Sequence, residues 1–149
     1  MFYLMITALL WAGDSVVKRK VEESNLDREP KSICLGRLLL QKVHNEGAIL
    51  GVFKDKPNMV KKISMGMMAV IAAIYLNLLH EKGKTGLKIA FALTAAGAAS
   101  NVTDRVRRHY VVDYLSIQTR WKKLRRIVFN LSDLCIMIGS ILFVVQKSK

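Results

Sequence analysis

Cysteine, histidine and proline are scarce in this sequence, and so are acidic residues. Two of the 149 residues are cysteine, two are proline and three are histidine, while 24 Lys and Arg stand against 11 Asp and Glu. Cys34 lies in a mixed polar stretch and Cys135 in a long apolar run, which argues against a disulfide between them. Neither cysteine has the spacing of a metal-ligand motif and the histidines (His44, His80 and His109) are scattered, so we expect no metal site.

Long hydrophobic runs are abundant by contrast, and 52% of the residues are hydrophobic. Three runs approach the roughly 17 to 25 residues that cross a bilayer as a helix. They are Ile63 to Leu79, Leu87 to Ser100 and Ile127 to Val145, and the stretch from Met1 to Lys18 is a fourth candidate. We therefore predict a membrane all-α fold with transmembrane helices at about 1–20, 60–80, 86–104 and 126–146, within a single domain of residues 1–149.

The first apolar stretch has two interpretations, a cleaved secretory signal or a retained helix. A secretory signal carries positive charge before its apolar region and small residues at a cleavage site after it. Here the basic residues Lys18, Arg19 and Lys20 follow the apolar region instead. We therefore expect a retained first transmembrane helix.

The stretch between the first two predicted helices differs in character. It begins with charged residues and Pro30, which indicate a helix end and a loop. Short apolar runs then alternate with Gly36, Gly47 and Gly51. A spanning helix here would bury ionisable side chains, namely Arg37, Lys42, His44 and Glu46. We expect a small β element at about 32–55 that lies on the membrane surface.

Ionisable residues inside a spanning helix need an explanation, because each costs on the order of 2.5 to 3.5 kcal/mol to insert. Asp14 and Lys18 are four residues apart on the first predicted helix, a spacing at which opposite charges meet. We interpret them as a structural pair that orders a site.

Polar residues also gather at two later helix ends. Asn101, Asp104 and Arg105 share one helix face where the third predicted helix leaves the membrane. Asn130 and Asp133 are three residues apart and share a face near the start of the fourth. These positions are candidates for a site at one membrane surface.

Asp113 lies between those two groups, in the apolar run HYVVDYL, which we expect to re-enter the membrane interface. Asp113 and Asp133 would then converge at the same depth. Two carboxyl groups held together share one proton, so one can act as a general base while the other donates a proton to a peptide carbonyl. This pattern is typical of aspartyl proteolysis, although lone aspartates in small membrane proteins also serve transport or helix pairing.

Four sequence blocks resemble signal peptidase II, the lipoprotein signal peptidase family. NVTDRVRRHYVVDYL and FNLSDLCI resemble its Asn-x-x-Asp-Arg block leading to Val-Val-Asp-Phe and its Phe-Asn-x-Ala-Asp block. GDSVVK and NEGAILGVF resemble its first-helix Asp-x-x-x-Lys and its Asn-x-Gly-Ala-x-x-Gly-x-Phe stretch. The blocks occur in the family's order along nearly the whole chain.

The resemblance implies a membrane peptidase with four transmembrane helices and a small extracytoplasmic β cradle. It places Asp113 and Asp133 on the catalytic aspartate pair, and Asn45 on the cradle residue that contacts the substrate. The positions that hold the pair and the substrate backbone are Asn101, Asp104, Arg105 and Asn130, and the structural pair is Asp14 with Lys18. The implied reaction is cleavage of a signal peptide just before a lipid-modified cysteine, without metal or cofactor, at the outer face of the bacterial cytoplasmic membrane.

The chain departs from the family pattern beside the intact aspartates. The altered positions are Glu46, Ile49, Leu50, Ser100, Ser132 and Leu134, and the segment TRWKKLRRIV is far more basic than in the family. We therefore expect retained chemistry with altered substrate contacts. Two alternatives stay open: a non-catalytic relative that binds signal peptides or a membrane partner, and a peptidase dedicated to a non-standard substrate. Sequence does not decide which aspartate is the base, because coupled groups titrate as a pair.

The basic residues concentrate in two connections, with 11 Lys and Arg from Lys18 to Lys62 and 8 from Asn101 to Arg126. The positive-inside rule would place these connections in the cytoplasm, whereas the resemblance places them outside. We follow the resemblance, because the aspartates must face translocated substrate. A basic outer collar would attract anionic membrane lipid or select an acidic substrate region or partner, and the spanning helices argue against nucleic acid as a partner.

Overall fold

Helices and one small sheet make up the fold. The structure is a computed structural model that describes residues 1–47 and 53–148. Its helices are α1 (Phe2–Glu22), α2 (Pro57–His80), α3 (Thr85–Arg107), the short α4 (Lys122–Arg125) and α5 (Leu131–Lys147). Its strands are β1 (Lys31–Ile33), β2 (Leu38–Asn45), β3 (Val111–Ile117) and β4 (Val128–Phe129).

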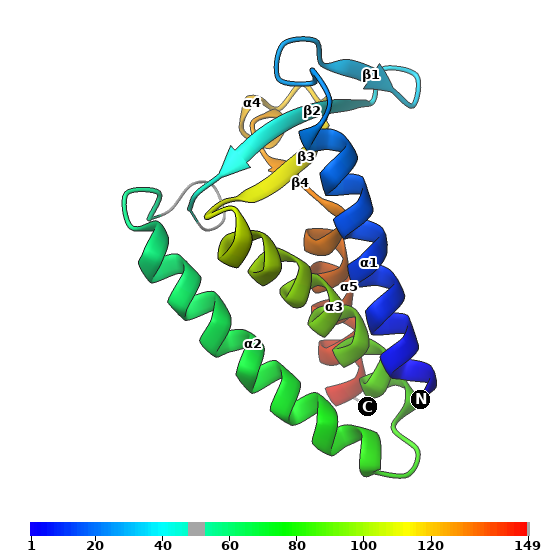
Figure 1. Cartoon of the computed structure of the whole chain (residues 1–149). Helices are drawn as coiled ribbons and strands as arrows, with labels where there is room; N and C mark the ends of the chain where they lie inside the picture. The colour runs from blue at the N-terminus through cyan, green and yellow to red at the C-terminus, as the bar shows by residue number, and fades with distance from the viewer. Residues whose placement is uncertain (48–52, 149) are drawn as a thin grey trace.

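The long helices lie side by side, with α3 in contact with α1, α2 and α5. The sheet lies at one end of these helices, while the two termini and the turn between α2 and α3 lie at the other end (Figure 1). α2 leans away from α3 toward the sheet, so the two helices form a V that opens at the sheet end (Figure 1). The central helix α3 therefore leads directly to the sheet, where β3 follows it.

Small residues allow α3 and α5 to pack closely. Ala90, Ala92, Ala95, Ala96 and Gly97 of α3 are buried, and so is Gly139 of α5. A Cβ added at Gly139 would lie 2.7 Å from the carbonyl oxygen of Ala90. Small side chains let helix backbones approach in this way. The close packing holds the polar end of α3 beside the first turn of α5.

The sheet is antiparallel, with strand order β1-β2-β3-β4. In its centre Val43 of β2 pairs with Asp113 of β3, and Asn45 pairs with Val111. The register shifts between Leu40 and Val43, an irregularity that bends a strand and changes where its side chains point. The end of β2 thus runs alongside Asp113.

A small apolar core joins the sheet to the end of α1. Val21 and Leu26 pack against Val112 and Tyr114 of β3, and all four are buried. Burying a large apolar side chain contributes roughly 1.5 to 3 kcal/mol. Because side chains alternate along a strand, this packing of Val112 and Tyr114 leaves Asp113 on the opposite face of β3.

One expectation about this end of the molecule is wrong, and another segment has a structure that was not expected. The run around Asp113 forms β3 and pairs with β2 and β4 on its two edges. The fourth helix does not start at about 126, because Val128 and Phe129 pair with β3 and Asn130 caps the helix that begins at Leu131.

The surface β element predicted at about 32–55 is only partly described. β1 and β2 occupy its first part, with β1 beginning one residue earlier at Lys31. Residues 48–52, which include Ile49 and Leu50, lie outside the described residues. The sheet is also larger than expected, because β3 and β4 join it from later in the chain.

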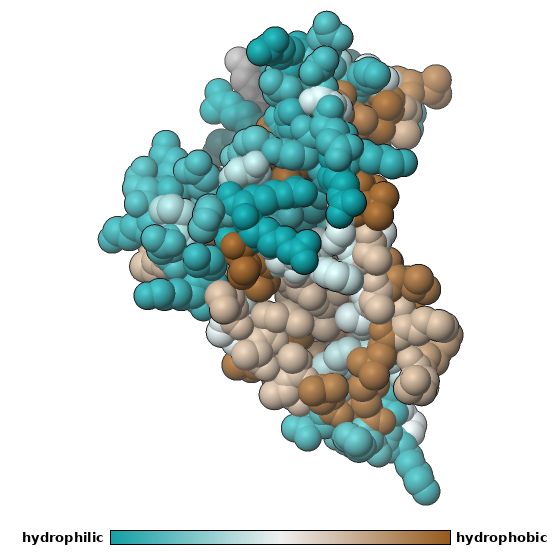
Figure 2. All heavy atoms as spheres, in the orientation of Figure 1, coloured by the Kyte–Doolittle hydropathy of each residue, from teal (hydrophilic) through white to brown (hydrophobic). Residues whose placement is uncertain are grey.

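Apolar side chains cover the outer faces of the helices. On α2, for example, Met67, Val70 and Ile74 are 62%, 59% and 47% exposed. Figure 2 shows the apolar residues spread over the helices and the hydrophilic ones around the sheet and at the far end. Among the described helices, α2 is long and apolar enough to cross a membrane by length and composition. Its most apolar 18-residue stretch has a mean hydropathy of 1.7, and 11% of the residues in that stretch are buried.

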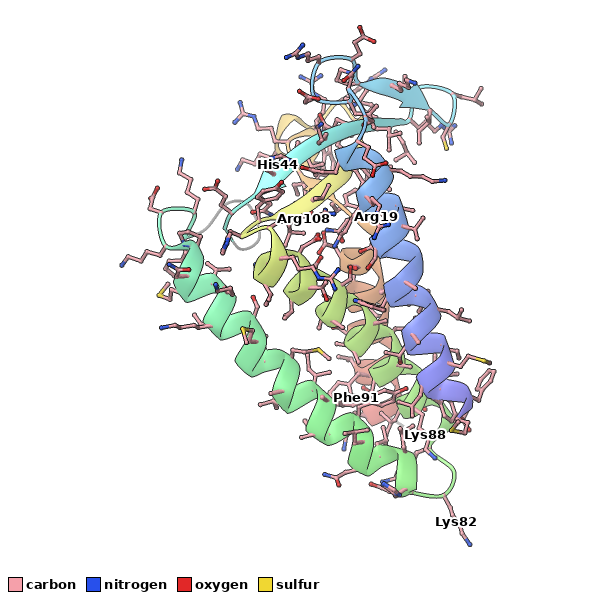
Figure 3. The ribbon with its side chains drawn as sticks, viewed as in Figure 1. Arg19, His44, Lys82, Lys88, Phe91 and Arg108 are labelled. Atoms are coloured by element: carbon pink, nitrogen blue, oxygen red, sulfur yellow. The ribbon has the colours of Figure 1, made fainter. Side chains whose placement is uncertain are left out.

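Charged side chains mark the two ends of the helices. Figure 3 shows Arg19, His44 and Arg108 at the sheet end and Lys82 at the α2–α3 turn. Lys88 lies near the same turn, where its ammonium donates to the Glu81 carbonyl oxygen (2.5 Å). The apolar faces therefore lie between two polar ends.

Candidate active site

Asp113 and Asp133 come together through Asn130, the residue just before α5. Asp113 lies on β3 and Asp133 in the first turn of α5. The side-chain amide of Asn130 donates to Asp113 (Nδ2 to Oδ1, 2.7 Å), and its backbone N–H donates to Asp133 (N to Oδ2, 3.1 Å). Asn130 has no exposed surface (0%), so one shielded residue orients both carboxyl groups.

The start of α5 fixes the direction of the Asp133 carboxyl group. Asn130 is the N-cap, and its Oδ1 accepts the backbone N–H of Asp133 (2.9 Å) while Asp133 accepts the N–H of Asn130. Such reciprocal bonds satisfy two N–H groups that a helix start leaves without partners. A carboxylate at this position is also favoured by the helix dipole. The same bonds therefore begin the helix and aim Asp133.

Two further asparagines supply a second N–H donor to each carboxyl group. Asn45, at the end of β2, donates to Asp113 (Nδ2 to Oδ2, 2.9 Å), and Asn101 of α3 donates to Asp133 (Nδ2 to Oδ1, 2.9 Å). The Oδ1 atom of Asn101 accepts from the Lys18 ammonium (2.9 Å). Because an ammonium only donates, Lys18 determines which end of the Asn101 amide faces Asp133.

Lys18 is the centre of a buried ionic network behind the asparagines. Its Nζ lies 2.9 Å from Asp14 Oδ2 and 3.1 Å from Asp104 Oδ2, and the Lys18 side chain is 1% exposed. A buried charge needs such partners, because burial removes its hydration. The contact predicted between Asp14 and Lys18 is present, and the network extends it to α3.

Three hydroxyl groups surround the Asp14 carboxyl group. Ser100 and Ser132 donate to its Oδ2 (2.6 and 2.5 Å), and Tyr114 donates to its Oδ1 (2.9 Å). Ser100 and Ser132 are two of the departures from the family pattern, and they are 1% and 2% exposed. Our expectation that they alter substrate contacts is wrong, because both are enclosed against Asp14.

Burial sets the electrostatics of Asp113, which is 3% exposed. Loss of hydration, reinforced by the negative charge of Asp133, raises the pKa of Asp113 to about 6. The hydrogen bonds from Asn45 and Asn130 oppose this rise, because they stabilise the ionised carboxylate. Asp113 therefore holds a proton at pH values where an exposed carboxyl has lost it.

Asp104 and Arg105 lie beside the carboxyl pair and make different contacts. Asp104 binds Lys18 and accepts the backbone N–H of Val112 (3.2 Å), which ties α3 to β3. Arg105 donates to the carbonyl oxygen of Gly47 (Nη2 to O, 2.9 Å), just after β2. Within the described residues, neither side chain is hydrogen-bonded to Asp113 or Asp133.

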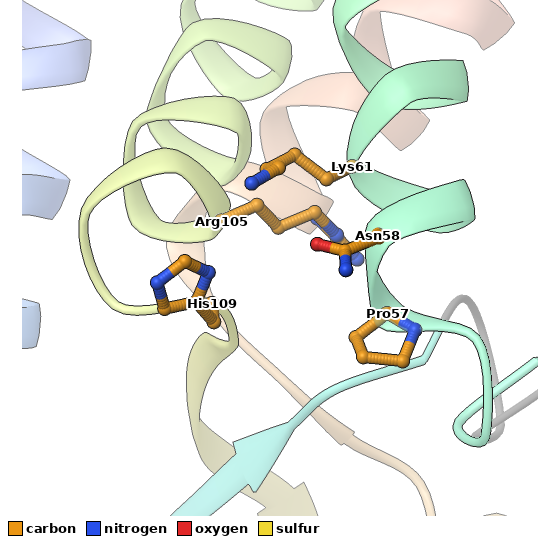
Figure 4. Close-up of a pocket in the computed structure, with 5 residues that line it drawn as sticks. All are labelled: Pro57, Asn58, Lys61, Arg105 and His109. Atoms are coloured by element: carbon orange, nitrogen blue, oxygen red, sulfur yellow. The ribbon is translucent and has the colours of Figure 1, made fainter.

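Arg105 also lines a pocket of about 250 Å³ between α2 and α3. The other lining residues are Pro57, Asn58, Lys61 and His109. Figure 4 shows Lys61 and Asn58 on α2 facing Arg105 on α3, with His109 at the end of α3. The Nε atom of Arg105 is buried without a hydrogen-bond partner among the described residues. The pocket is therefore lined by two cationic side chains, Arg105 and Lys61, which are hydrogen-bond donors.

The structure thus joins five of the predicted residues in one hydrogen-bonded cluster. These five are Asn45, Asn101, Asp113, Asn130 and Asp133. Sequence reasoning missed Tyr114, whose phenol both binds Asp14 and accepts the N–H of Leu131 (3.0 Å). Its position next to Asp113 was the available signal, because alternation along a strand points Tyr114 to the helix side.

The arrangement suits acid–base chemistry at a peptide bond. A carboxyl group that keeps its proton beside an ionised one can donate a proton while its neighbour accepts one. Within residues 1–47 and 53–148, no group of three or more His, Cys, Asp or Glu is placed to hold a metal ion. The cluster itself supplies two carboxyl groups, Asp113 and Asp133, for such chemistry.

Comparison with known proteins gives a consistent result. The family model described as signal peptidase (SPase) II matches residues 6–148. A lipoprotein signal peptidase from Serratia marcescens is 34% identical over 143 residues, which cover 95% of this chain and 81% of that protein. One from Moorella thermoacetica is 30% identical over 140 residues, which cover 94% of this chain and 88% of that protein.

Solved structures share the fold. Two structures of bacterial membrane enzymes determined by the in meso method superpose with TM-scores of 0.82 and 0.84. They are 20% and 22% identical to this chain, of which they cover 97% and 99%. The matches span 86% and 93% of those chains. The helices and the sheet therefore belong to one shared architecture.

Proposed function

The chain belongs to the signal peptidase II family, and from that premise we propose that it is a membrane aspartyl endopeptidase that removes signal peptides. The observation that carries the proposal is the pair of carboxyl groups, Asp113 and Asp133, oriented by one buried asparagine. Two relatives are named lipoprotein signal peptidases, which supports a scissile bond just before a lipid-modified cysteine. The mechanism needs the two carboxyl groups and one water molecule.

We assign the acid to Asp113 and the base to Asp133. Asp113 is nearly enclosed, and its raised pKa of about 6 favours the protonated form. Asp133 is more exposed and accepts a backbone N–H at the start of a helix, which stabilises a carboxylate. A peptide that covers Asp113 removes more water and raises its pKa further. The shared proton then stays on Asp113 near neutral pH.

The reaction begins with attack by water on the carbonyl carbon before the cysteine. Asp133 takes a proton from the water, and Asp113 gives its proton to the carbonyl oxygen, which yields a tetrahedral diol. The diol collapses when Asp113 takes a hydroxyl proton back. The C–N bond breaks as Asp133 passes its proton to the departing nitrogen. Both carboxyl groups return to their starting states, and one water has been consumed.

Neighbouring residues hold the reacting groups in place. Asn45, Asn101 and Asn130 orient the carboxyl groups by the bonds described above, and Arg105 ties α3 to the end of β2 through its bond to the Gly47 carbonyl oxygen. Holding reactants in an attack geometry lowers the barrier, and a displacement of about 1 Å costs roughly 100-fold in rate. Rigid support for the asparagines is therefore part of the proposed mechanism.

The proposed membrane arrangement has four spanning helices. α1, α2, α3 and α5 are 21, 24, 23 and 17 residues long, at or above the lower limit of roughly 17 residues for a span. Their exposed apolar side chains suit contact with lipid, as Met67 and Val70 illustrate. The buried charges of α1 are paired inside the bundle. The sheet then lies at the outer surface of the cytoplasmic membrane.

The direct test is cleavage of a lipid-modified proprotein by the purified protein in detergent. We expect release of the signal peptide, and a loss of roughly 100- to 10,000-fold in kcat/KM for Asp113→Asn and for Asp133→Asn. Asp27→Asn is a matched control, because Asp27 is 48% exposed and pairs only with Lys42 among the described residues. It should cleave like the parent protein.

The rival function is binding of a signal peptide without cleavage. The altered family positions favour it, and the intact carboxyl pair argues against it. A binder would keep its affinity for the proprotein after Asp113→Asn and would release no peptide before the substitution. If the proprotein stays intact after incubation with the folded parent protein, the proposed peptidase activity is wrong and the binding function remains.

A further inference from the structure

A groove lies beside Asp113 on the sheet side of the candidate active site. Its volume is about 600 Å³, within the range of ligand pockets, roughly 300 to 1,000 Å³. Asp113 and Asn45 line one part of it, and residues of α4 and β4 line another. The groove is therefore continuous with the cluster that holds the carboxyl pair.

Basic side chains outnumber acidic ones in the lining of the groove. Lys54, Lys123 and Arg126 line it and all three are exposed, whereas its acidic lining residues are Glu46 and Asp113. Within the described part of the chain, the ion pairs are made by other cations, so none of these three is neutralised by a carboxylate. Clustered charges of one sign in a concave site attract a ligand of the opposite sign.

The position of the groove decides which part of a substrate can occupy it. The long helices lie at one end of the molecule and the sheet with α4 at the other (Figure 1), and the carboxyl pair comes from β3 and the first turn of α5, where the two ends meet. The apolar part of a signal peptide belongs beside the helices in the bilayer. The chain that emerges from the membrane past the scissile bond then runs along the sheet side.

We propose that this groove binds acidic residues that follow the cleavage site, and that Lys54, Lys123 and Arg126 select substrates that carry them. The inference rests on the proposed function and narrows its substrate class. Because the groove leads to Asp113, any other occupant would block the carboxyl group that the substrate must reach. For that reason a lipid headgroup is a less suitable ligand for these three cations than an acidic segment of the substrate.

An acidic segment would also assist the chemistry. A negative charge placed near Asp113 disfavours loss of its proton, as the charge of Asp133 already does. An acidic substrate would therefore help to keep Asp113 protonated. Cleavage of acidic substrates should therefore extend to higher pH than cleavage of neutral ones.

The experiment compares two lipid-modified proproteins that differ only after the cysteine, with Asp and Glu in one and Asn and Gln in the other. In neutral detergent we expect kcat/KM to be about three- to tenfold higher for the acidic substrate, the effect of a few partly exposed ion pairs. The ratio should fall toward one as salt is raised. In Lys123→Gln/Arg126→Gln it should approach one at low salt.

A control variant separates the groove from the general charge of the molecule. Arg19→Gln/Lys20→Gln removes the same charge from exposed positions on α1, and Arg19 lies at the sheet end (Figure 3). It should keep the preference. If both variants lose the preference, it comes from the overall positive charge of the molecule, and the proposal that the groove selects acidic substrates is wrong.

The remaining outcomes also decide the matter. Equal cleavage of both substrates by the parent protein would overturn the acidic selectivity and leave the proposed function intact. Cleavage of neither would remove the proposed function and this inference with it. If Lys123→Gln/Arg126→Gln slows both substrates equally, and only in vesicles that contain phosphatidylglycerol, the cations hold lipid and the proposal is wrong.

Discussion

Lys18 shows how much of the site depends on one buried cation. It contacts the carboxylates of Asp14 and Asp104 and the side-chain oxygen of Asn101. Removal of one partner from a buried ionic group leaves the remaining charges without compensation, at a cost of about 3 to 5 kcal/mol. The Asn101 amide would also lose the contact that directs its N–H groups toward Asp133.

Lys18→Met should therefore lower both stability and activity. We expect the free energy of unfolding to fall by about 3 to 5 kcal/mol, measured by thermal unfolding in detergent, together with a loss of cleavage. Lys20→Met is the matched control, because Lys20 is exposed on the same helix. Equal unfolding curves for the two variants would contradict the assigned role of Lys18.

The pKa of Asp113 makes a second prediction at the scale of a single residue. The proposed mechanism needs Asp113 protonated, and with a pKa of about 6 about half of the free enzyme is in that form at pH 6 and about a tenth at pH 7. We therefore expect kcat/KM to decline as pH rises above about 6. Because the Asn45 bond stabilises the ionised form, Asn45→Ala raises this pKa and should move the decline to higher pH.

The pH profile of His44→Gln provides the control for Asn45→Ala. His44 is a nearby titratable group that pairs with Glu22 (3.0 Å) at the rim of the sheet. Its removal should leave the decline in place. A decline that disappears in His44→Gln, or that moves to lower pH in Asn45→Ala, would show that Asp113 is not the group observed.

At the scale of elements, the contact between α3 and α5 sets the distance across the site. Gly97 of α3 faces the first turns of α5, where an added Cβ would overlap the Ser132 carbonyl oxygen and lie 2.8 Å from Ile136 Cγ1. A backbone atom cannot rotate aside as a side chain can. Any side chain at Gly97 must therefore separate the helices that carry Asn101 and Asp133.

Gly97→Ala should lower stability by about 1 to 3 kcal/mol, the usual cost of overpacking, and should reduce kcat/KM at least tenfold by moving Asn101. Gly66→Ala is the control, because, apart from the backbone of its own helix, none of the described residues has an atom within 4 Å of a Cβ built at Gly66 on α2. That change should be neutral or stabilising by up to about 1 kcal/mol. The test compares the thermal unfolding and the cleavage rates of the Gly97→Ala and Gly66→Ala variants.

Helices were easier to predict from sequence than the sheet, and the reason is physical. Long apolar runs indicate spans because the bilayer requires them, and α2 and α3 lie where those runs are. The strand β3 was missed because VVDYL carries apolar residues on both faces, which hides the alternation of a half-buried strand. Its pairing with β2 is a contact across some 70 residues, which no local pattern specifies.

The five clustered residues could be named from the sequence, whereas their contacts could not. The spacing of Asn130 and Asp133 indicated a shared face, and the structure turns that spacing into a capping box. Ser100 and Ser132 were misread because each hydroxyl finds Asp14 on another helix. A family pattern marks such positions as unusual, while the partner of a hydroxyl is known only from the packing.

At the scale of the whole molecule, the arrangement of charge bears on orientation. Both heavily basic connections meet at the sheet end, where the positive-inside rule would expect cytoplasm. Several of these cations are paired: Lys18 with Asp14, Lys42 with Asp27, and Arg108 with Asp104. The rule counts Lys and Arg whether or not they are paired, so it opposes the proposed outer location of the sheet, and an experiment must decide between them.

The two cysteines make the orientation measurable in the natural sequence. Cys34 is exposed at the sheet end, in the turn between β1 and β2, and Cys135 is buried in α5. With the sheet outside, a membrane-impermeant maleimide should label intact cells at Cys34. Cys34→Ser should abolish the labelling, which would identify the reacting residue.

The opposite end of the molecule supplies the control. Lys82→Cys in the Cys34→Ser background places a thiol at the exposed α2–α3 turn, which lies far from the sheet (Figure 3). It should react only after the membrane is permeabilised. The reverse pattern, with the turn labelled in intact cells and Cys34 protected, would put Asp113 and Asp133 on the cytoplasmic side. Exported signal peptides could not then reach the carboxyl pair, because the proposed cleavage requires substrate and aspartates on the same outer surface.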